Sequence, residues 1–168
     1  TIEGLNIATA SIQQNDFGMG FSVSLSKDGT IAAISSPTSS DSTLGLIETG
    51  HVKVYEYNGT NWTQKGSTLH GGYTAISALI GWSVDLSDDG LKLLIQSAVE
   101  PTDEGYSTSQ STYYIYENDD WVLKSRSGLS IHRQGVRGQM SGDGKVIAVT
   151  NPNAAISASS SPAIKISE

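Results

Sequence analysis

The chain contains no cysteine, few prolines and few charged residues. Without cysteine it has no disulfides, no thiolate nucleophile and no Cys-type zinc site. Charged residues make up 16% of the 168 positions, and 17 acids against 10 bases give a formal net charge of −7. An acidic chain with no basic stretch repels phosphate backbones, so nucleic acid is not an expected partner. The longest apolar runs, such as Ile31-Ala32-Ala33-Ile34, are too short to cross a bilayer, and we expect no membrane insertion.

Small polar and turn-forming residues take up much of the chain instead, with 26 Ser, 14 Thr and 18 Gly. Hydrophobic residues, at 37%, are too many for a disordered chain. This balance predicts one all-β domain over residues 1–168, with short strands and many turns. Because the chain begins at Thr1 rather than at Met, we expect a processed product or part of something longer.

Three segments align without a gap, beginning at Gly20, Gly81 and Gly135, and each contains the tetrapeptide Ser-x-Asp-Gly. Before the first tetrapeptide, Phe21-Ser22-Val23-Ser24-Leu25 alternates with the two-residue period of a β-strand. After each tetrapeptide the chain is apolar at consecutive positions, which indicates a strand buried on both faces. Each segment therefore predicts a β-hairpin whose turn glycine has a positive φ.

A second hairpin is predicted after each of the first two. Residues 50–66 turn at Asn58-Gly59-Thr60, residues 112–124 turn at 118–120, and a third unit starts at 163. In this alignment Tyr55 corresponds to Tyr116. Two hairpins per repeat make four antiparallel strands, the content of one propeller blade. The predicted repeats cover about 16–71, 79–128 and 132–168, just under three blades and so an incomplete propeller unless assembled.

The string Gly-Phe-Ser-Val-Ser-Leu-Ser-x-Asp-Gly, followed by Gly-His-Val-Lys-Val-Tyr-Glu-Tyr-Asn-Gly-Thr-Asn-Trp, resembles FG-GAP-type (integrin-like) β-propeller repeats. Such repeats are found in surface proteins of marine algae, bacteria and viruses. The resemblance runs from Asp16 to Glu168 and implies four-stranded blades in an extracellular, virion or other particle-surface location. Some blades of that family carry an Asp-x-Asp-x-Asp-Gly calcium loop. Here the turns lack that ladder of carboxylates, so the resemblance implies no calcium, and we expect no metal or cofactor.

No catalytic constellation stands out in the sequence. The Ser-x-Asp-Gly-Thr string is similar to the Asp box of sialidases but lacks its spacer and its Trp. His51, His70 and His132 share no spacing with one another or with a Ser or Asp motif. No pair of carboxylates suited to glycoside cleavage is identifiable. The sequence therefore predicts no enzyme, with a glycoside-processing enzyme as a weak alternative.

Aromatic residues on the second hairpins support a stronger alternative, a lectin-like propeller that stacks sugars on aromatic rings. The candidate residues are Tyr57, Trp62, Tyr116 and Trp121. The competing interpretation is that Trp62 and Trp121, which are in register between repeats, are blade packing residues. Asn58-Gly59-Thr60 and Asn61-Trp62-Thr63 also match the N-glycosylation pattern, so Asn58 and Asn61 are candidate acceptors.

The small number of predicted blades leads us to expect that the chain assembles with other copies. Closed propellers have about four to eight blades, and this sequence holds fewer than three. We expect apolar faces to be exposed at Phe21/Val23/Leu25 and at Leu91/Leu93/Ile95, with an unpaired strand edge beside them. The sequence thus predicts a non-enzymatic structural or binding module at a cell or particle surface. It would form a homo-oligomer or larger assembly through blade faces and strand edges, as a ring or a filament. The competing account is a piece of a longer propeller.

Overall fold

The structure, a computed structural model, describes residues 18–41, 44–45, 49–70, 79–98, 108–130, 137–150 and 163–165. Within these ranges the regular elements are β-strands and every strand pairing is antiparallel, so the predicted all-β class is confirmed. The same ranges hold no helix with the length and apolar character needed to span a membrane.

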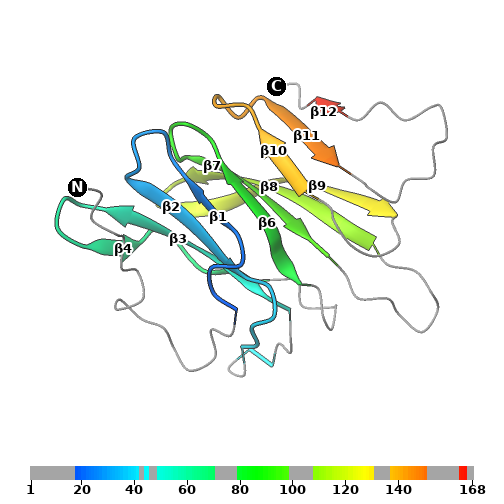
Figure 1. The fold of residues 1–168 in the computed structure, drawn as a ribbon, viewed down its shortest axis with the longest axis horizontal. Coiled ribbons are helices and arrows are strands. Elements are labelled where there is room, and N and C mark those ends of the chain that lie inside the picture. Colours follow the sequence, from blue (N-terminus) through cyan, green and yellow to red (C-terminus); the bar gives the residue numbers. More distant parts are fainter. Residues whose placement is uncertain are drawn as a thin grey trace.

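The strands form three sheets that follow one another along the chain (Figure 1). The first sheet contains β1 (Val23–Leu25), β2 (Ile31–Ser36), β3 (His51–Tyr57), β4 (Trp62–Gln64) and β5 (Leu69–His70). The second contains β6 (Ile80–Leu86), β7 (Lys92–Ser97), β8 (Thr108–Glu117) and β9 (Asp120–Ser130). The third contains β10 (Arg137–Met140), β11 (Val146–Thr150) and β12 (Ala163–Lys165).

Each sheet begins with the hairpin that the Ser-x-Asp-Gly repeat predicts, and its strands are ordered as they occur in the chain. The second sheet has the simple order β6-β7-β8-β9. In the first sheet, two short strands, β4 and β5, take the place of a single fourth strand, and both pair with β3. The break between them includes Gly66, whose φ is 75°. Short strands joined by tight glycine turns therefore give three serial antiparallel units.

The strand register corrects one alignment made from the sequence. Ala32 lies opposite Tyr55, and the equivalent Leu93 lies opposite Tyr114. Tyr55 therefore corresponds to Tyr114, and the alignment of Tyr55 with Tyr116 is wrong. The cause is the connection between hairpins, which is shorter in the second repeat than in the first. The correction makes the cross-strand pair Tyr57/Trp62 equivalent to the pair Tyr116/Trp121.

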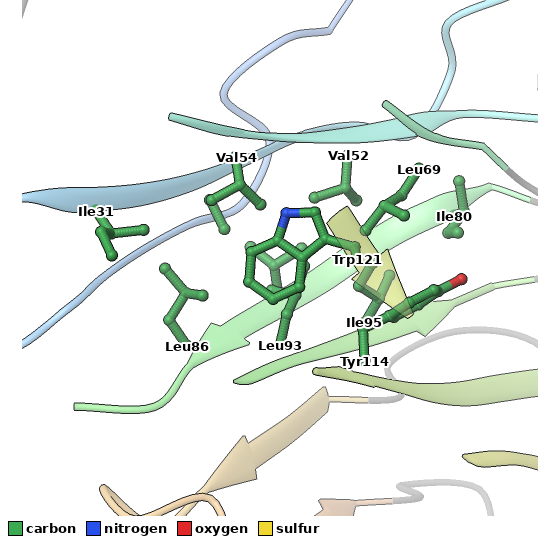
Figure 2. Packing of buried hydrophobic residues seen from close by; sticks show 12 residues of the cluster. Ile31, Val52, Val54, Leu69, Ile80, Leu86, Leu93, Ile95, Tyr114 and Trp121 are labelled. Carbon is green, nitrogen blue, oxygen red and sulfur yellow. The ribbon is translucent and has the colours of Figure 1, made fainter. Parts of the chain in front are cut away.

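The second sheet is packed between the other two. On one side, residues of the first sheet meet residues of the second in the main core (Figure 2): Ile31, Ala33, Val52, Val54 and Leu69 against Ile80, Val84, Leu86, Leu93, Ile95, Tyr114 and Trp121. On the other side, Leu94 and Tyr113 pack against Ile147 of β11. Consecutive apolar residues in β7 thus serve opposite faces of one sheet, as the sequence predicts.

The expected exposure of apolar faces is correct for the first repeat and for one of the three residues of the second. Phe21, Val23 and Leu25 are 53%, 53% and 52% exposed. In the second repeat Leu91 is 39% exposed, as expected, but Leu93 and Ile95 are fully buried because the first sheet covers them, so the expectation is wrong for these two.

Candidate functional site

The three Ser-x-Asp-Gly turns have the same pattern of internal hydrogen bonds. In the first, the Ser26 hydroxyl donates to Asp28 at 2.7 Å, and Asp28 accepts the Thr30 N–H at 3.0 Å. The Ser26 oxygen also accepts the Ile31 N–H at 2.9 Å. The same bonds recur in the turns at Ser87 and Ser141. The turn glycines have φ values of 72°, 66° and 71°. The motif is therefore a hairpin turn with a positive-φ glycine, as predicted, and side-chain hydrogen bonds stabilise it.

Hydrogen bonding within these turns also sets their electrostatics. The Ser26 hydroxyl and the Thr30 N–H lower the pKa of Asp28, and the Ser141 hydroxyl and the Lys145 N–H do the same for Asp143. Both carboxylates are thereby held ionised as acceptors for their own turns.

Backbone bonds join the three turns in a row. The Lys27 N–H donates to the Asp88 carbonyl at 3.0 Å, and the Asp88 N–H donates to the Gly142 carbonyl at 2.7 Å. These three residues occupy the same variable position of the tetrapeptide. A 3.2 Å ion pair between Lys27 and Asp88 adds to the first link. Each turn is therefore fixed to the next, always in the same direction.

Side chains at the first strand of one sheet accept hydrogen bonds from the backbone of the first strand of the next sheet. Ser22, immediately before β1, accepts the Val84 N–H at 3.1 Å, and Ser24 in β1 accepts the Leu86 N–H at 3.0 Å. In β6, Asp85 takes the place of Ser24 and accepts the Met140 N–H at 2.5 Å. Figure 1 shows β1, β6 and β10 side by side in this arrangement. The repeats are thus joined by a polar contact that is used twice.

Asp85 sits between two of these contacts. Its second carboxylate oxygen receives the Ser24 hydroxyl at 3.4 Å. Burial raises the pKa of Asp85, and the bonds from the Met140 N–H and the Ser24 hydroxyl offset part of that rise. Burial therefore disfavours the ionised form of Asp85, while one of its oxygens is needed to accept the Met140 N–H.

The turn glycine of the second repeat and that of the third each lie against a side chain of the preceding repeat. A Cβ placed on Gly90 would lie 2.5 Å from Ile31 Cδ1, and one on Gly144 would lie 2.4 Å from Lys92 Cδ. Ile31 and Lys92 are equivalent, since each is the residue two after its turn glycine. At the equivalent Gly29, in the part of the chain that the structure describes, no atom lies within 4 Å of such a Cβ. Among the described residues, the turn glycine of the first repeat therefore has open space where the next two turn glycines are covered.

Trp121 and Asp120 fasten the outer hairpin of the second repeat to the first. The Trp121 indole N–H donates to the Lys65 carbonyl at 2.9 Å, and Asp120 accepts the Ser67 N–H at 2.7 Å. The Ser67 bond lowers the pKa of Asp120. Trp121 is 6% exposed, and its ring lies within the main core (Figure 2). A ring buried in this way offers no face for a sugar to stack on.

The equivalent pair in the first repeat is more open. The Tyr57 and Trp62 rings lie 5.3 Å apart between centroids with a 30° interplanar angle, and Tyr57 is 38% exposed. Tyr116 instead packs against Trp121 and lies under the Lys65 ammonium, 4.2 Å from the ring centroid. Of the four candidate stacking residues, Tyr57 and Trp62 are the two that form an accessible aromatic pair.

Both glycosylation candidates are exposed at the tip of the same hairpin. The Asn58 side-chain oxygen accepts the Thr60 and Asn61 N–H groups at 3.0 and 2.9 Å. Asn58 therefore also shapes its turn, as asparagine commonly does.

The fold brings together two pairs that the sequence did not associate. Ser39 Oγ lies 2.6 Å from His51 Nδ1, with both residues buried, and His70 Nε2 lies 3.9 Å from Asp41. The single proton of the Ser39 hydroxyl faces two acceptors, His51 Nδ1 and the Ser36 carbonyl at 2.9 Å, so the donor in the Ser39–His51 bond is set by the tautomer of the imidazole. The third histidine, His132, lies outside the described residues.

Two further findings concern metals and relatives. In the described ranges, no three or more His, Asp or Glu side chains form a group that could hold a metal ion. No protein-family model matches the chain, and no curated protein matches it significantly.

Proposed function

We propose that the chain is a non-enzymatic structural or binding module built of propeller-type blades, which assembles at a cell or particle surface. The observation that carries the proposal is the twice-used contact between repeats, in which Ser24 binds Leu86 and Asp85 binds Met140. The Ser and Asp side chains of the repeated motif form hydrogen bonds within their own turns, and Ser24 and Asp85 form hydrogen bonds between sheets. An exposed apolar face at Val23 and Leu25 and an acidic, Ser/Thr/Gly-rich composition support a surface role in assembly.

Light scattering on the isolated chain over a range of concentrations tests this function. The expected result is a mass that rises with concentration to multiples of 17.7 kDa. A chain that stays monomeric at every concentration would argue against assembly. Reproducible turnover of a chromogenic glycoside after repurification would argue for an enzyme instead.

Carbohydrate binding is the second candidate, and the accessible Tyr57/Trp62 pair favours it. The exposed part of Tyr57 offers an apolar aromatic surface on which the apolar face of a sugar could stack. A glycan array tests this function with Tyr57→Ala, using Leu123→Ala, another exposed position, as the matched control. Binding that Tyr57→Ala abolishes and Leu123→Ala preserves would support the lectin. An array with no binding would exclude the glycans it displays.

A further inference from the structure

The first sheet carries an uncovered equivalent of a face that elsewhere makes contact. Val84 and Leu86 are 6% and 7% exposed because they pack against the first sheet. Val23 and Leu25 hold the same positions in β1, yet they are 53% and 52% exposed. β1 is also an edge strand of its sheet, as β6 is. The face that docks repeat two onto repeat one is therefore present, and open, on repeat one itself.

The turn glycines give independent evidence for the same vacancy. Gly90 lies under Ile31 and Gly144 lies under Lys92, whereas the space above Gly29 is open among the described residues. Gly20 likewise has open space, while the equivalent Gly81 lies against Ser35. A preceding repeat would fill both spaces.

The third sheet carries the complementary surface. Gln139 is equivalent to Ser24 and Asp85, which accept the N–H groups of the following repeat. Val146 is equivalent to Ile31 and Lys92, which cover the following turn glycine. Gln139 is exposed and Val146 is 49% exposed. The chain therefore displays both halves of its own internal contact, one on each outer sheet.

We infer that the third sheet of one copy docks on the first sheet of a second copy and reproduces the contact between repeats. The inference rests on the proposed assembly and specifies its surfaces and its polarity. The Gln139 amide oxygen accepts the Leu25 N–H, and Val146 covers Gly29. A second copy is the occupant because its third sheet carries Gln139 and Val146 at the positions that make these contacts between repeats inside the chain. Such a head-to-tail interface generates a ring or an open filament rather than a two-fold dimer.

Two charged variants and their mixture test the interface by light scattering. Leu25→Lys blocks the face of the first sheet, and Val146→Glu blocks that of the third. Leu123→Lys, at a position 43% exposed on β9, is the control. We expect each blocking variant alone to be monomeric and the control to assemble like the unaltered chain. An equimolar mixture of the two blocking variants should give a species of twice the monomer mass and nothing larger, because one intact interface remains.

The other outcomes separate this inference from the proposed function. If both blocking variants assemble like the unaltered chain, assembly stands and this interface is wrong. If only Leu25→Lys prevents assembly, the interface is symmetric and the head-to-tail polarity is wrong. A chain that never assembles overturns both.

Cysteine cross-linking gives a second measurement that does not depend on the charged variants. The chain has no cysteine of its own, so Gly29→Cys mixed with Val146→Cys should oxidise to a dimer containing one of each. Cross-linking no greater than with Leu123→Cys in place of Val146→Cys would also overturn the inference.

Discussion

The carboxylate of Asp85 accepts the backbone N–H of Met140 across the boundary between two sheets, at 2.5 Å. In the preceding boundary an uncharged serine hydroxyl makes the same bond. The contact therefore needs an acceptor oxygen and does not need a charge.

Replacing Asp85 tests this distinction. Asp85→Asn retains an acceptor oxygen for the Met140 N–H and removes a half-buried charge. We expect its free energy of unfolding at neutral pH to equal or exceed that of the unaltered chain. Asp85→Ala leaves the N–H without its partner and should cost about 1–2 kcal/mol. Urea unfolding measures both, and equal losses in the two variants would contradict this account.

The pH dependence of the same pair follows from the raised pKa of Asp85. A carboxyl whose pKa is higher in the folded than in the unfolded state is destabilising when ionised, and the loss is relieved as pH falls through the folded pKa. The advantage of Asp85→Asn should therefore be greatest at neutral pH and shrink on acidification. An advantage that grew on acidification would contradict the assignment.

The turn aspartates should respond to acid in the opposite sense. Their own hydrogen bonds lower the pKa values of Asp28 and Asp143 below 3.8. Such groups stabilise the fold above the unfolded value and lose that contribution as pH falls through the folded value. We expect unfolding free energy to fall below about pH 4, and to fall less steeply in the double variant Asp28→Asn/Asp143→Asn. Parallel pH profiles for the two proteins would count against this origin.

Gly90 and Gly29 separate backbone strain from crowding between repeats. Both have positive φ, so alanine at either position should cost about 1–2 kcal/mol. At Gly90 the new methyl would also meet Ile31, and overpacking adds about 1–3 kcal/mol. Gly90→Ala should therefore be the more destabilising of the two in urea unfolding at concentrations below those of assembly. Equal losses would mean that the repeats do not press together at this turn.

The two tryptophans provide a matched pair for the outer hairpins. Trp121→Ala removes a core ring and its bond to the Lys65 carbonyl, so we expect a loss of about 3–5 kcal/mol. Trp62→Ala alters a half-buried ring beside Tyr57 and should cost no more than about 1 kcal/mol. Thermal or urea unfolding of both variants measures the difference. Similar losses would show that Trp62 is also a packing anchor in the isolated chain.

The sequence predicted the hairpins and their turns because those depend on local chemistry. Alternation at Phe21–Leu25 predicted a strand, and the glycine of Ser-x-Asp-Gly predicted a positive φ. Both are found in the structure. The serines of that strand, however, turn out to face the neighbouring sheet and bind its backbone. Alternation distinguishes two faces of a strand but does not say which of them meets a neighbour.

The candidate site was harder to predict because it depends on which sheets lie side by side. Trp62 and Trp121 occupy equivalent positions, yet in the part of the chain that the structure describes it is Trp121 that is bonded to the preceding repeat, through the Lys65 carbonyl. The acceptor row at Ser24 and Asp85 was missed, although both residues fall in one column of the repeat alignment. Two different acceptors in one column are a usable signal, since they share a hydrogen-bonding capacity and little else.

The middle sheet has a consequence for how such a chain can change length. One of its faces fits the sheet before it, and the other accepts the sheet after it through Asp85. A duplicated copy of this sheet, inserted beside the original, would again place an Asp85 acceptor opposite a Leu86 N–H, the position that the Met140 N–H occupies in the third sheet. Gain or loss of whole repeats is therefore a tolerated route of variation, whereas insertion of part of a repeat would leave one boundary without its row of hydrogen bonds.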